Sequence, residues 1–330
     1  MATTRRAVVT GITGMVGMAV AQLLTTQGWT VRGVVRAPLS PRPDYVAEEY
    51  LGDLCRPESL AGACRDAELV VHSGGLVSDW SPAEDFWRIN RDGTRALLRE
   101  ATRSGVDRFV YVGTANVFGF RTNEVINEDS AKICPPYLYP RSKLAAENSV
   151  WEYGERGLGV TAVYPTWVFG PGDRHLVPEL VTNLRAGRFV HIGRGQAPLE
   201  LTYSENLAEA IVLASTADAG RGAGFIVGDG FGATLGDFIN ATAAAAGVAP
   251  PRFSIPFGVA KGLGGISEAV ARFVPGSGRP MLTRYAVASL ATGVRFDLRR
   301  ISALGYRPAV SMADGLERTL RAAEASPVAS

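Results

Sequence analysis

Three glycines at three-residue spacing, Gly11, Gly14 and Gly17, separate the strand-like segment 7–10 from the helix-like segment 15–27. Residues without a Cβ allow a tight turn, a close approach of phosphate to the backbone, and close packing of a helix on a sheet. The helix start also offers unpaired N–H groups to a phosphate. We therefore predict that the loop binds the pyrophosphate of a dinucleotide through Gly11, Thr13, Gly14, Met15, Val16 and Gly17.

The first half of the chain alternates β-branched runs with amphipathic segments. Such alternation indicates a parallel sheet whose strands are joined by crossover helices. The fold class that we predict is α/β, a doubly wound parallel sheet of the Rossmann type, with ligands at the carboxyl ends of its strands. We expect helices at 15–27 and 90–104, and strands at 7–10, 30–35, 69–72, 109–112 and 160–163.

After Tyr164 the pattern becomes less regular, with a Pro-Gly turn at 170–173 and an Ala/Gly-rich run at 241–251. We expect residues 1–165 to form the dinucleotide-binding Rossmann domain, with later strands contributed from about 200–228. Residues 166–330 would mostly form a smaller, C-terminal substrate-binding lobe.

The end of the second predicted strand indicates which dinucleotide binds. NAD-preferring folds of this kind usually place an acid there to bind the ribose hydroxyls. This chain has Arg36 at that point, and a guanidinium favours a 2′-phosphate. One charge-assisted hydrogen bond contributes about 1.5 to 3 kcal/mol, roughly a ten- to hundredfold preference. We predict NADP(H) as the preferred cofactor and NAD(H) as the second candidate, and the alternative for Arg36 is a solvated surface side chain.

Tyr139 and Lys143 are four residues apart, which places them one turn apart on the same face of a helix. A free tyrosine titrates near pH ~10, so proton transfer near neutrality needs its pKa lowered by about 3 units. Lys143 and the positive charge of an oxidised nicotinamide can supply that lowering. We predict that Tyr139 gives or takes the proton of a substrate oxygen that Thr114 holds by a hydrogen bond. The alternative is a surface helix on which Tyr139 packs and Lys143 is solvated.

Further segments occur in an order that matches one family. They are Gly52-Asp53-Leu54, Val71-His72-Ser73-Gly74-Gly75, and the segments 88–94, 111–119, 139–143 and 164–173. Together with the glycine loop they resemble the extended short-chain dehydrogenase/reductase family, of the NAD-dependent epimerase/dehydratase type. The resemblance spans nearly all of the chain.

The resemblance implies roles for these segments. Segment 52–54 is similar to the family's adenine contact, 71–75 to its loop beside the cofactor ribose, and 164–173 to the segment whose backbone faces the nicotinamide. Lys143 would also hold the nicotinamide ribose. The cofactor-binding residues added in this way are Asp53, Leu54, Ser73, Gly74, Gly75, Val112, Tyr139, Lys143, Tyr164, Pro165 and Val168. Two departures could reshape the pocket, because Tyr164 replaces a usual arginine and Gly74-Gly75 replaces a usual pair of alanines.

The resemblance also bears on the substrate. Family members that act on nucleotide sugars commonly carry an arginine where this chain has Leu199, followed by Glu200, so a diphosphate would meet an apolar side chain and a carboxylate. Segments 202–207 and 78–80 look like the 3β-hydroxysteroid dehydrogenase and dihydroflavonol reductase branch, whose substrates are apolar. An apolar lining with a few polar groups suits such ligands. The predicted substrate-binding residues are Trp80, Thr114, Phe118 and Trp167.

The expected function is an NADP(H)-dependent oxidoreductase that interconverts a ketone and a secondary alcohol on a mainly apolar small molecule. A steroid-, flavonoid-, polyketide- or β-keto-like compound would fit. The first alternative is a nucleotide-sugar epimerase, dehydratase or reductase, which would use the same Tyr139 and Lys143. The second is a regulator that binds NADP without catalysis. The sequence leaves the oligomeric state open, with a homodimer as the candidate.

Composition narrows the partners further. The net charge is only +2, and no basic run with interleaved aromatic residues occurs, so we expect no nucleic acid partner. Cys55, Cys64 and Cys134 have neither zinc nor redox spacing, which predicts no metal site and fits a reducing compartment. The segment before residue 7 leaves no room for a signal peptide. We expect a cytoplasmic protein that binds a small molecule.

The longest apolar stretch is 257–274, but Lys261, Glu268 and Arg272 interrupt it. A membrane-spanning helix needs about 18 or more apolar residues, so we expect no integral membrane segment. We predict a lid or substrate-domain helix there, with peripheral membrane contact as the alternative.

Overall fold

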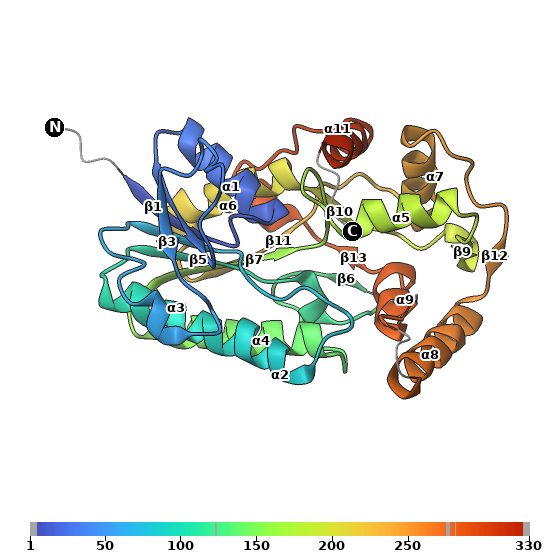
Figure 1. The fold of residues 1–330 in the computed structure, drawn as a ribbon, viewed down its shortest axis with the longest axis horizontal. Helices are drawn as coiled ribbons and strands as arrows, with labels where there is room; N and C mark the ends of the chain where they lie inside the picture. Colours follow the sequence, from blue (N-terminus) through green and yellow to red (C-terminus); the bar gives the residue numbers. More distant parts are fainter. Residues whose placement is uncertain (1–4, 123, 275–277, 281, 326–330) are drawn as a thin grey trace.

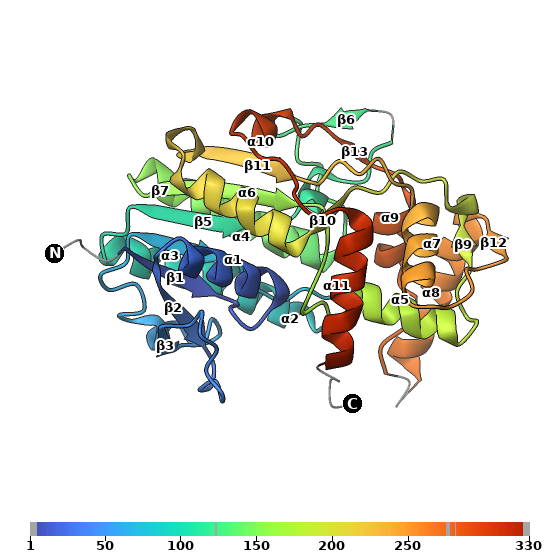
Figure 2. The ribbon, with the colours of Figure 1, turned by 90° about the horizontal axis from the view of Figure 1, so that it is seen from above.

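The computed structural model describes residues 5–122, 124–274, 278–280 and 282–325. Within them a parallel seven-stranded sheet has the order β11-β7-β5-β4-β1-β2-β3, and Figure 2 shows it with helices in front and behind. Its strands are β1 Arg6–Thr10, β2 Thr30–Val35, β3 Glu48–Leu51, β4 Leu69–His72, β5 Arg108–Val112, β7 Gly159–Pro165 and β11 Ala223–Val227. The predicted fold class is confirmed: the sheet is doubly wound and of the Rossmann type.

Helices cover both faces of the sheet (Figure 1). On one face α1 (Met15–Thr26) packs against α6 (Ser204–Thr216), and on the other α3 (Gly93–Arg103) packs against α4 (Leu138–Glu155). The strands between them are buried on both sides, which is why β4, β5 and β7 read as continuous apolar runs. The carboxyl ends of these strands face the rest of the chain.

A second, mostly helical lobe lies beyond those strand ends (Figures 1 and 2). Its helices are α5 Leu176–Arg185, α7 Leu235–Ala245, α8 Phe257–Phe273, α9 Arg284–Ala291 and α11 Met312–Ala325. Short parallel strand pairs join parts of the chain, namely β8 Trp167–Phe169 with β10 Leu201–Tyr203, β9 His191–Ile192 with β12 Ser254–Ile255, and β6 Val125–Ile126 with β13 Arg295–Phe296. After β13 the chain returns to the edge strand β11 through α10, Arg299–Ala303.

The structure extends or corrects several predicted elements. The helical run that we expected at 90–104 starts much earlier, with α2 (Ala83–Asp85) and a π-helical turn at Phe86–Asp92 that leads directly into α3. The edge strand β3 is absent from the prediction because its residues are mostly polar. Two arginines, Arg6 and Arg32, ion-pair with Glu48 on it.

The second half of the sequence contributes to the Rossmann layer through α6 and β11, within the segment 200–228 where later strands were expected. The division of the chain near residue 165 stays a prediction. Among the residues that the structure describes, no helix is long and apolar enough to cross a bilayer.

Candidate active site

The glycine loop between β1 and α1 packs as closely as its sequence predicts. Gly11 has a φ of +68°, and a Cβ on it would lie 2.7 Å from the Gly74 nitrogen. A Cβ on Gly17 would lie 2.2 Å from the Gly11 carbonyl oxygen. Gly14 and Thr13 are exposed, and the first turn of α1 holds no acidic residue. The turn is therefore an open cradle of backbone groups at the positive end of a helix, which fits a pyrophosphate.

The predicted site for the adenosine ribose lies at the ends of β2 and β3. Arg36 follows β2 and is exposed, and Asp53 follows β3. The pKa of Asp53 lies below its usual value, chiefly because its carboxylate accepts the Cys55 N–H at 2.9 Å, while the charges of Arg56 and Arg36 lower it further. Arg36 and Asp53 thus share the strand ends where a dinucleotide fold holds the adenosine ribose.

Thr114 and Tyr139 come from separate elements and meet beyond the end of β5. Thr114 caps the short 3₁₀ helix Ala115–Phe118 and is 7% exposed, and its Oγ1 accepts the Asn116 N–H at 3.3 Å. Tyr139 is the second residue of α4, where Pro140 is tolerated because the first turn lacks an intrahelical acceptor for its nitrogen. The Thr114 hydroxyl hydrogen-bonds the Tyr139 phenol. The structure therefore brings these two predicted residues together.

The pKa of Tyr139 differs in direction from the sequence-based expectation. Burial raises it to about 12, and the hydrogen bond from Thr114 opposes this rise. The Lys143 ammonium does not reach the phenol in this arrangement, because it donates to the Val112 carbonyl at 2.6 Å and lies over the Tyr111 ring, 4.4 Å from its centroid. The protein's own charged groups thus do not produce the predicted lowering of the Tyr139 pKa.

Lys143 is 6% exposed, so the predicted alternative of a solvated lysine is wrong. Burial lowers its pKa to about 7, and the charge of Glu147, one helical turn further along α4, raises it. Burial lowers the pKa of the nearby His72 to about 3, and the charge of the Lys143 ammonium adds to that lowering. Lys143 is consequently poised to lose or keep its proton near neutral pH.

A buried hydrogen-bond network that the sequence analysis missed fixes α4 to the loop after β4. Asn90, in the π-helical turn, donates to Ser142 at 2.9 Å and to the Leu76 carbonyl at 3.0 Å, and accepts the Leu76 N–H at 2.7 Å. A Cβ on Gly75 would lie 3.0 Å from the Asn90 Oδ1 and 4.0 Å from the Lys143 Nζ. An alanine here would therefore press on Asn90 and touch the ammonium of the proposed catalytic lysine, and the glycine leaves that space free. A π-helical turn commonly marks such a site.

Tyr164, the other departure from the family pattern, lies in a second buried network. Its hydroxyl donates to Glu147 Oε1 at 2.6 Å and accepts from Lys132 at 2.9 Å, and Lys132 also ion-pairs with Glu147. Trp151 donates its ring N–H to the same carboxylate oxygen at 2.8 Å. Tyr164 is 2% exposed, so only its backbone can serve the cofactor contact that the resemblance implies.

The second lobe adds an aromatic residue that sequence reasoning did not find. Tyr285 on α9 lies edge-on to Tyr139, with ring centroids 6.3 Å apart, and accepts a hydrogen bond from Asn116 at 2.7 Å. Phe120 and Tyr137 pack against the same ring. The ring of Tyr139 is therefore in contact with an aromatic cluster that contains residues of both lobes.

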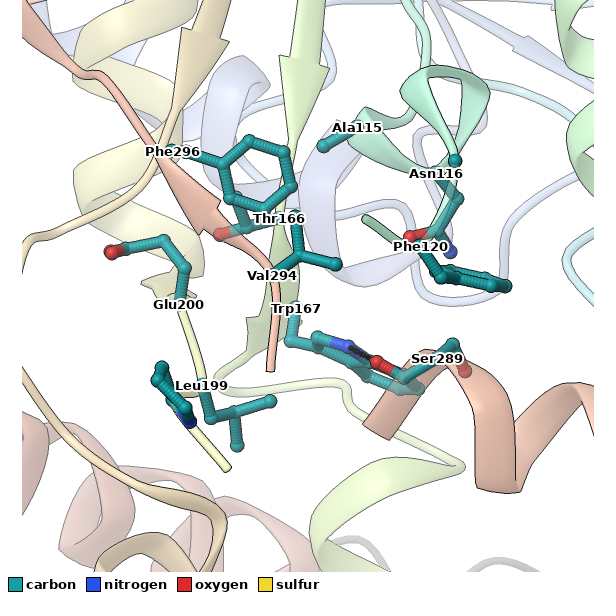
Figure 3. A pocket seen from close by; sticks show the side chains of 12 residues that line it. Ala115, Asn116, Phe120, Thr166, Trp167, Leu199, Glu200, Ser289, Val294 and Phe296 are labelled. Atoms are coloured by element: carbon teal, nitrogen blue, oxygen red, sulfur yellow. Dashed lines mark hydrogen bonds between the residues drawn. The ribbon is translucent and has the colours of Figure 1, made fainter. Parts of the chain in front are cut away.

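Next to this cluster is a pocket between the lobes (Figure 3). Phe120, Trp167 and Phe296 supply aromatic surface, and Asn116 and Glu200 supply polar atoms. Burial raises the pKa of Glu200 to about 7, and its Oε1 accepts the Gly230 N–H at 2.8 Å. The remaining lining residues are Ala115, Gly119, Thr166, Pro198, Leu199, Ser289 and Val294.

The predicted substrate residues differ in whether they lie at the pocket. Trp167 lines the pocket and Thr114 adjoins it through Ala115. Phe118 does not line it, because the ring is 0% exposed and packs edge-on against Tyr164 at 5.2 Å, so its prediction as a substrate residue is corrected to a core role. Trp80 is partly buried and lies outside the lining, and its role stays a prediction.

Comparisons with known proteins agree with this geometry. The model of the NAD dependent epimerase/dehydratase family matches residues 7–228. That match covers more than half of the chain, so the chain belongs to this family, which is dependent on a nicotinamide dinucleotide. The predicted resemblance is thereby confirmed.

Relatives and a solved structure are similar over almost the whole length. The chain is 28% identical to a 2-alkyl-3-oxoalkanoate reductase of Stenotrophomonas maltophilia, covering 96% of this chain and 99% of the relative. It is 29% identical to the decarboxylating sterol-4-alpha-carboxylate 3-dehydrogenase erg26 of Schizosaccharomyces pombe, covering 82% of each. The crystal structure of gox2253 superposes with a TM-score of 0.77 at 26% identity, covering 98% of both chains.

Proposed function

We propose that this protein is an NADPH-dependent reductase that converts a ketone on a mainly apolar small molecule to a secondary alcohol, by chemistry that is reversible. The observation that carries the proposal is the Thr114–Tyr139 hydrogen bond beside an aromatic pocket, with Tyr139 one helical turn from the buried Lys143. The names of the relatives, which are a reductase and a dehydrogenase, support the same reaction class.

The proposed roles follow from where the polar atoms lie. When bound, the nicotinamide supplies the hydride. Thr114 holds the carbonyl oxygen of the substrate, and Tyr139 gives that oxygen its proton. Lys143 would hold the nicotinamide ribose with its ammonium, and the positive charge that the nicotinamide gains on giving up the hydride would favour loss of the proton from the phenol, whose pKa burial raises.

The pocket lining supports an apolar substrate over a sugar nucleotide. Leu199 and Glu200 both line it, and Glu200 is the acidic group that a diphosphate would have to approach. Like charges in a partly buried site repel strongly. The aromatic rings of Phe120, Trp167 and Phe296 suit rings or alkyl chains instead.

We expect Arg36→Ala to reduce the preference for NADPH over NADH by about ten- to a hundredfold. The reason is that one charge-assisted hydrogen bond to the 2′-phosphate is lost. The measurement is kcat/KM for both cofactors in wild type and variant. The matched control is Arg42→Ala, which removes an exposed arginine further along the same connection. An unchanged cofactor ratio in Arg36→Ala would remove the argument for NADP.

The proposed function is tested by following NADPH absorbance against steroid, flavonoid, β-keto and sugar-nucleotide ketones. We expect oxidation of NADPH with at least one apolar ketone and none with the sugar nucleotides. The second candidate, an epimerase of nucleotide sugars, is favoured by the name of the family alone. It would instead retain its cofactor through purification and interconvert sugars without net oxidation.

A further inference from the structure

Helix α8 carries five strongly exposed apolar side chains on one face, which we call the α8 stripe. Val259, Leu263, Ile266, Val270 and Phe273 are 50%, 47%, 63%, 47% and 79% exposed. Their spacing of four, three, four and three residues aligns them along the helix axis. Phe253, 75% exposed in the segment that precedes the helix, adds to the apolar surface. Surface apolar residues are ordinary when scattered, but an aligned set of this size marks an interaction site.

The stripe is not the face by which α8 packs on the protein. That face holds the buried Ala260 and Gly264, and a Cβ on Gly264 would lie 3.1 Å from the Arg284 nitrogen of α9. Glu268 completes the contact, since its carboxylate accepts hydrogen bonds from the Arg284 backbone and side chain, both at 2.7 Å. The helix is therefore anchored on α9, and it lies at the periphery of the lobe (Figure 1). The stripe is on the exposed side of the helix.

The unpaired charges on and near α8 are of one sign. Arg252, Lys261 and Arg272 are exposed and form no ion pair within the described part of the chain. At about 100° per residue, Lys261 and Arg272 lie on the side of α8 away from the stripe, next to the face that packs on α9. Glu268, the acidic residue of α8, has a side chain only 14% exposed and is neutralised by Arg284. The helix thus combines an apolar face with a cationic polar side.

We propose that α8 docks on the surface of an anionic membrane, with the stripe in the headgroup and acyl boundary. An interfacial helix combines an apolar face, a cationic polar face and too little total hydrophobicity to span the bilayer, as α8 does. A second copy of the chain is disfavoured, because one helix face is narrow beside the roughly 800 Å² that a stable partner buries.

The position of α8 would bring the active site close to a membrane on which this helix docks. Helix α9 separates it from the active site, and Tyr285 on α9 contacts Tyr139. One layer of helix, about 8 to 10 Å, therefore lies between the membrane-facing stripe and the proposed general acid. An apolar substrate could enter this lobe from the bilayer. That last step depends on the proposed function, whereas membrane docking does not.

The test is co-sedimentation of the full chain with vesicles of phosphatidylglycerol and phosphatidylcholine, beside vesicles of phosphatidylcholine alone. We expect binding to the anionic vesicles that weakens as salt rises. Ile266→Glu should lower the bound fraction about tenfold, because it places a charge in the stripe, and Lys261→Glu with Arg272→Glu should lower it on anionic vesicles. The matched control is Leu51→Glu, at a residue 58% exposed on β3 at the opposite end of the molecule (Figures 1 and 2).

Three results would overturn the proposal. The first is no binding to anionic vesicles by the wild type. The second is an equal loss of binding in Leu51→Glu and Ile266→Glu. The third is a wild-type dimer that Ile266→Glu dissociates in sedimentation velocity while neither protein binds vesicles, which would make a second copy the occupant. NADPH binding by each variant verifies that it is folded, and ketone turnover without vesicles reports on the proposed function separately.

Discussion

Tyr139→Phe is expected to lower kcat about 10²- to 10⁴-fold while the Kd for NADPH stays within a fewfold of the wild-type value. The substitution keeps the ring that packs at 6.3 Å from Tyr285 and removes only the hydroxyl that Thr114 holds. A positioned general acid contributes about this factor, so its removal should affect the chemical step and not cofactor binding. Steady-state turnover and fluorescence titration with NADPH measure the two quantities.

The neighbouring tyrosine provides the control. Tyr137 lies two residues earlier and packs on the same Tyr285 ring at 5.1 Å, but its hydroxyl donates weakly to the Arg284 carbonyl at 3.4 Å. We expect Tyr137→Phe to keep kcat within severalfold of wild type. Near-full activity in Tyr139→Phe, or equal losses in the two variants, would show that the phenol of Tyr139 is not the proton donor.

Lys143→Met should have the second largest effect, a fall in kcat of about 10²- to 10³-fold with a rise in the KM for NADPH. The change removes the ammonium that would hold the cofactor ribose, and with it the positive charge one helical turn from the phenol. In the direction of alcohol oxidation, which needs the phenolate, the residual activity should increase steadily as the pH rises toward 10. Lys143→Arg, which keeps the charge, should lose less. Unchanged kcat and KM in Lys143→Met would contradict its role.

In the proposed mechanism Lys143 supports turnover, but its burial lowers the stability of the folded protein. The pKa of Lys143 is about 7 in the folded protein and 10.5 for an unperturbed lysine, so between these pH values the unfolded chain binds more protons and the free energy of unfolding rises with pH. Below pH 7 both states are protonated and the burial penalty is complete. Urea unfolding of the cofactor-free protein should therefore show a stability gap in favour of Lys143→Met that narrows by about 2 kcal/mol from pH 7 to pH 9. A gap that does not change with pH would mean that Lys143 is not buried as an ion.

Local spacing explains why much of the fold and some of the site could be predicted. The glycine loop is a set of contacts between residues a few positions apart, and Gly11 and Gly17 make them as expected. Tyr139 and Lys143 share a helix, so their separation of four residues fixes which face they occupy. Thr114 was found because segment 111–119 resembles the family's segment that carries the active-site Ser or Thr, and Thr114 occupies that position.

Long-range packing explains what was missed. Tyr285 reaches Tyr139 from a lobe whose docking no local pattern encodes. The π-helical turn that aims Asn90 at Ser142 interrupts no hydrophobic period, so the sequence reads simply as a later helix start. Phe118 was assigned to the substrate because it lies in a loop at a strand end, but the 3₁₀ turn directs its ring into the core. The pKa of Tyr139 depends on burial, which spacing alone does not reveal.

The most direct test of the central claim uses NADPH deuterated at the transferable position of C4, with the ketone that wild type reduces fastest. We predict that the product alcohol carries one deuterium on its carbinol carbon, that NADPH is consumed in equal amount, and that Tyr139→Phe slows this transfer without redirecting it. A product free of deuterium, or deuterium retained by the bound cofactor while the substrate is merely isomerised, would contradict the account.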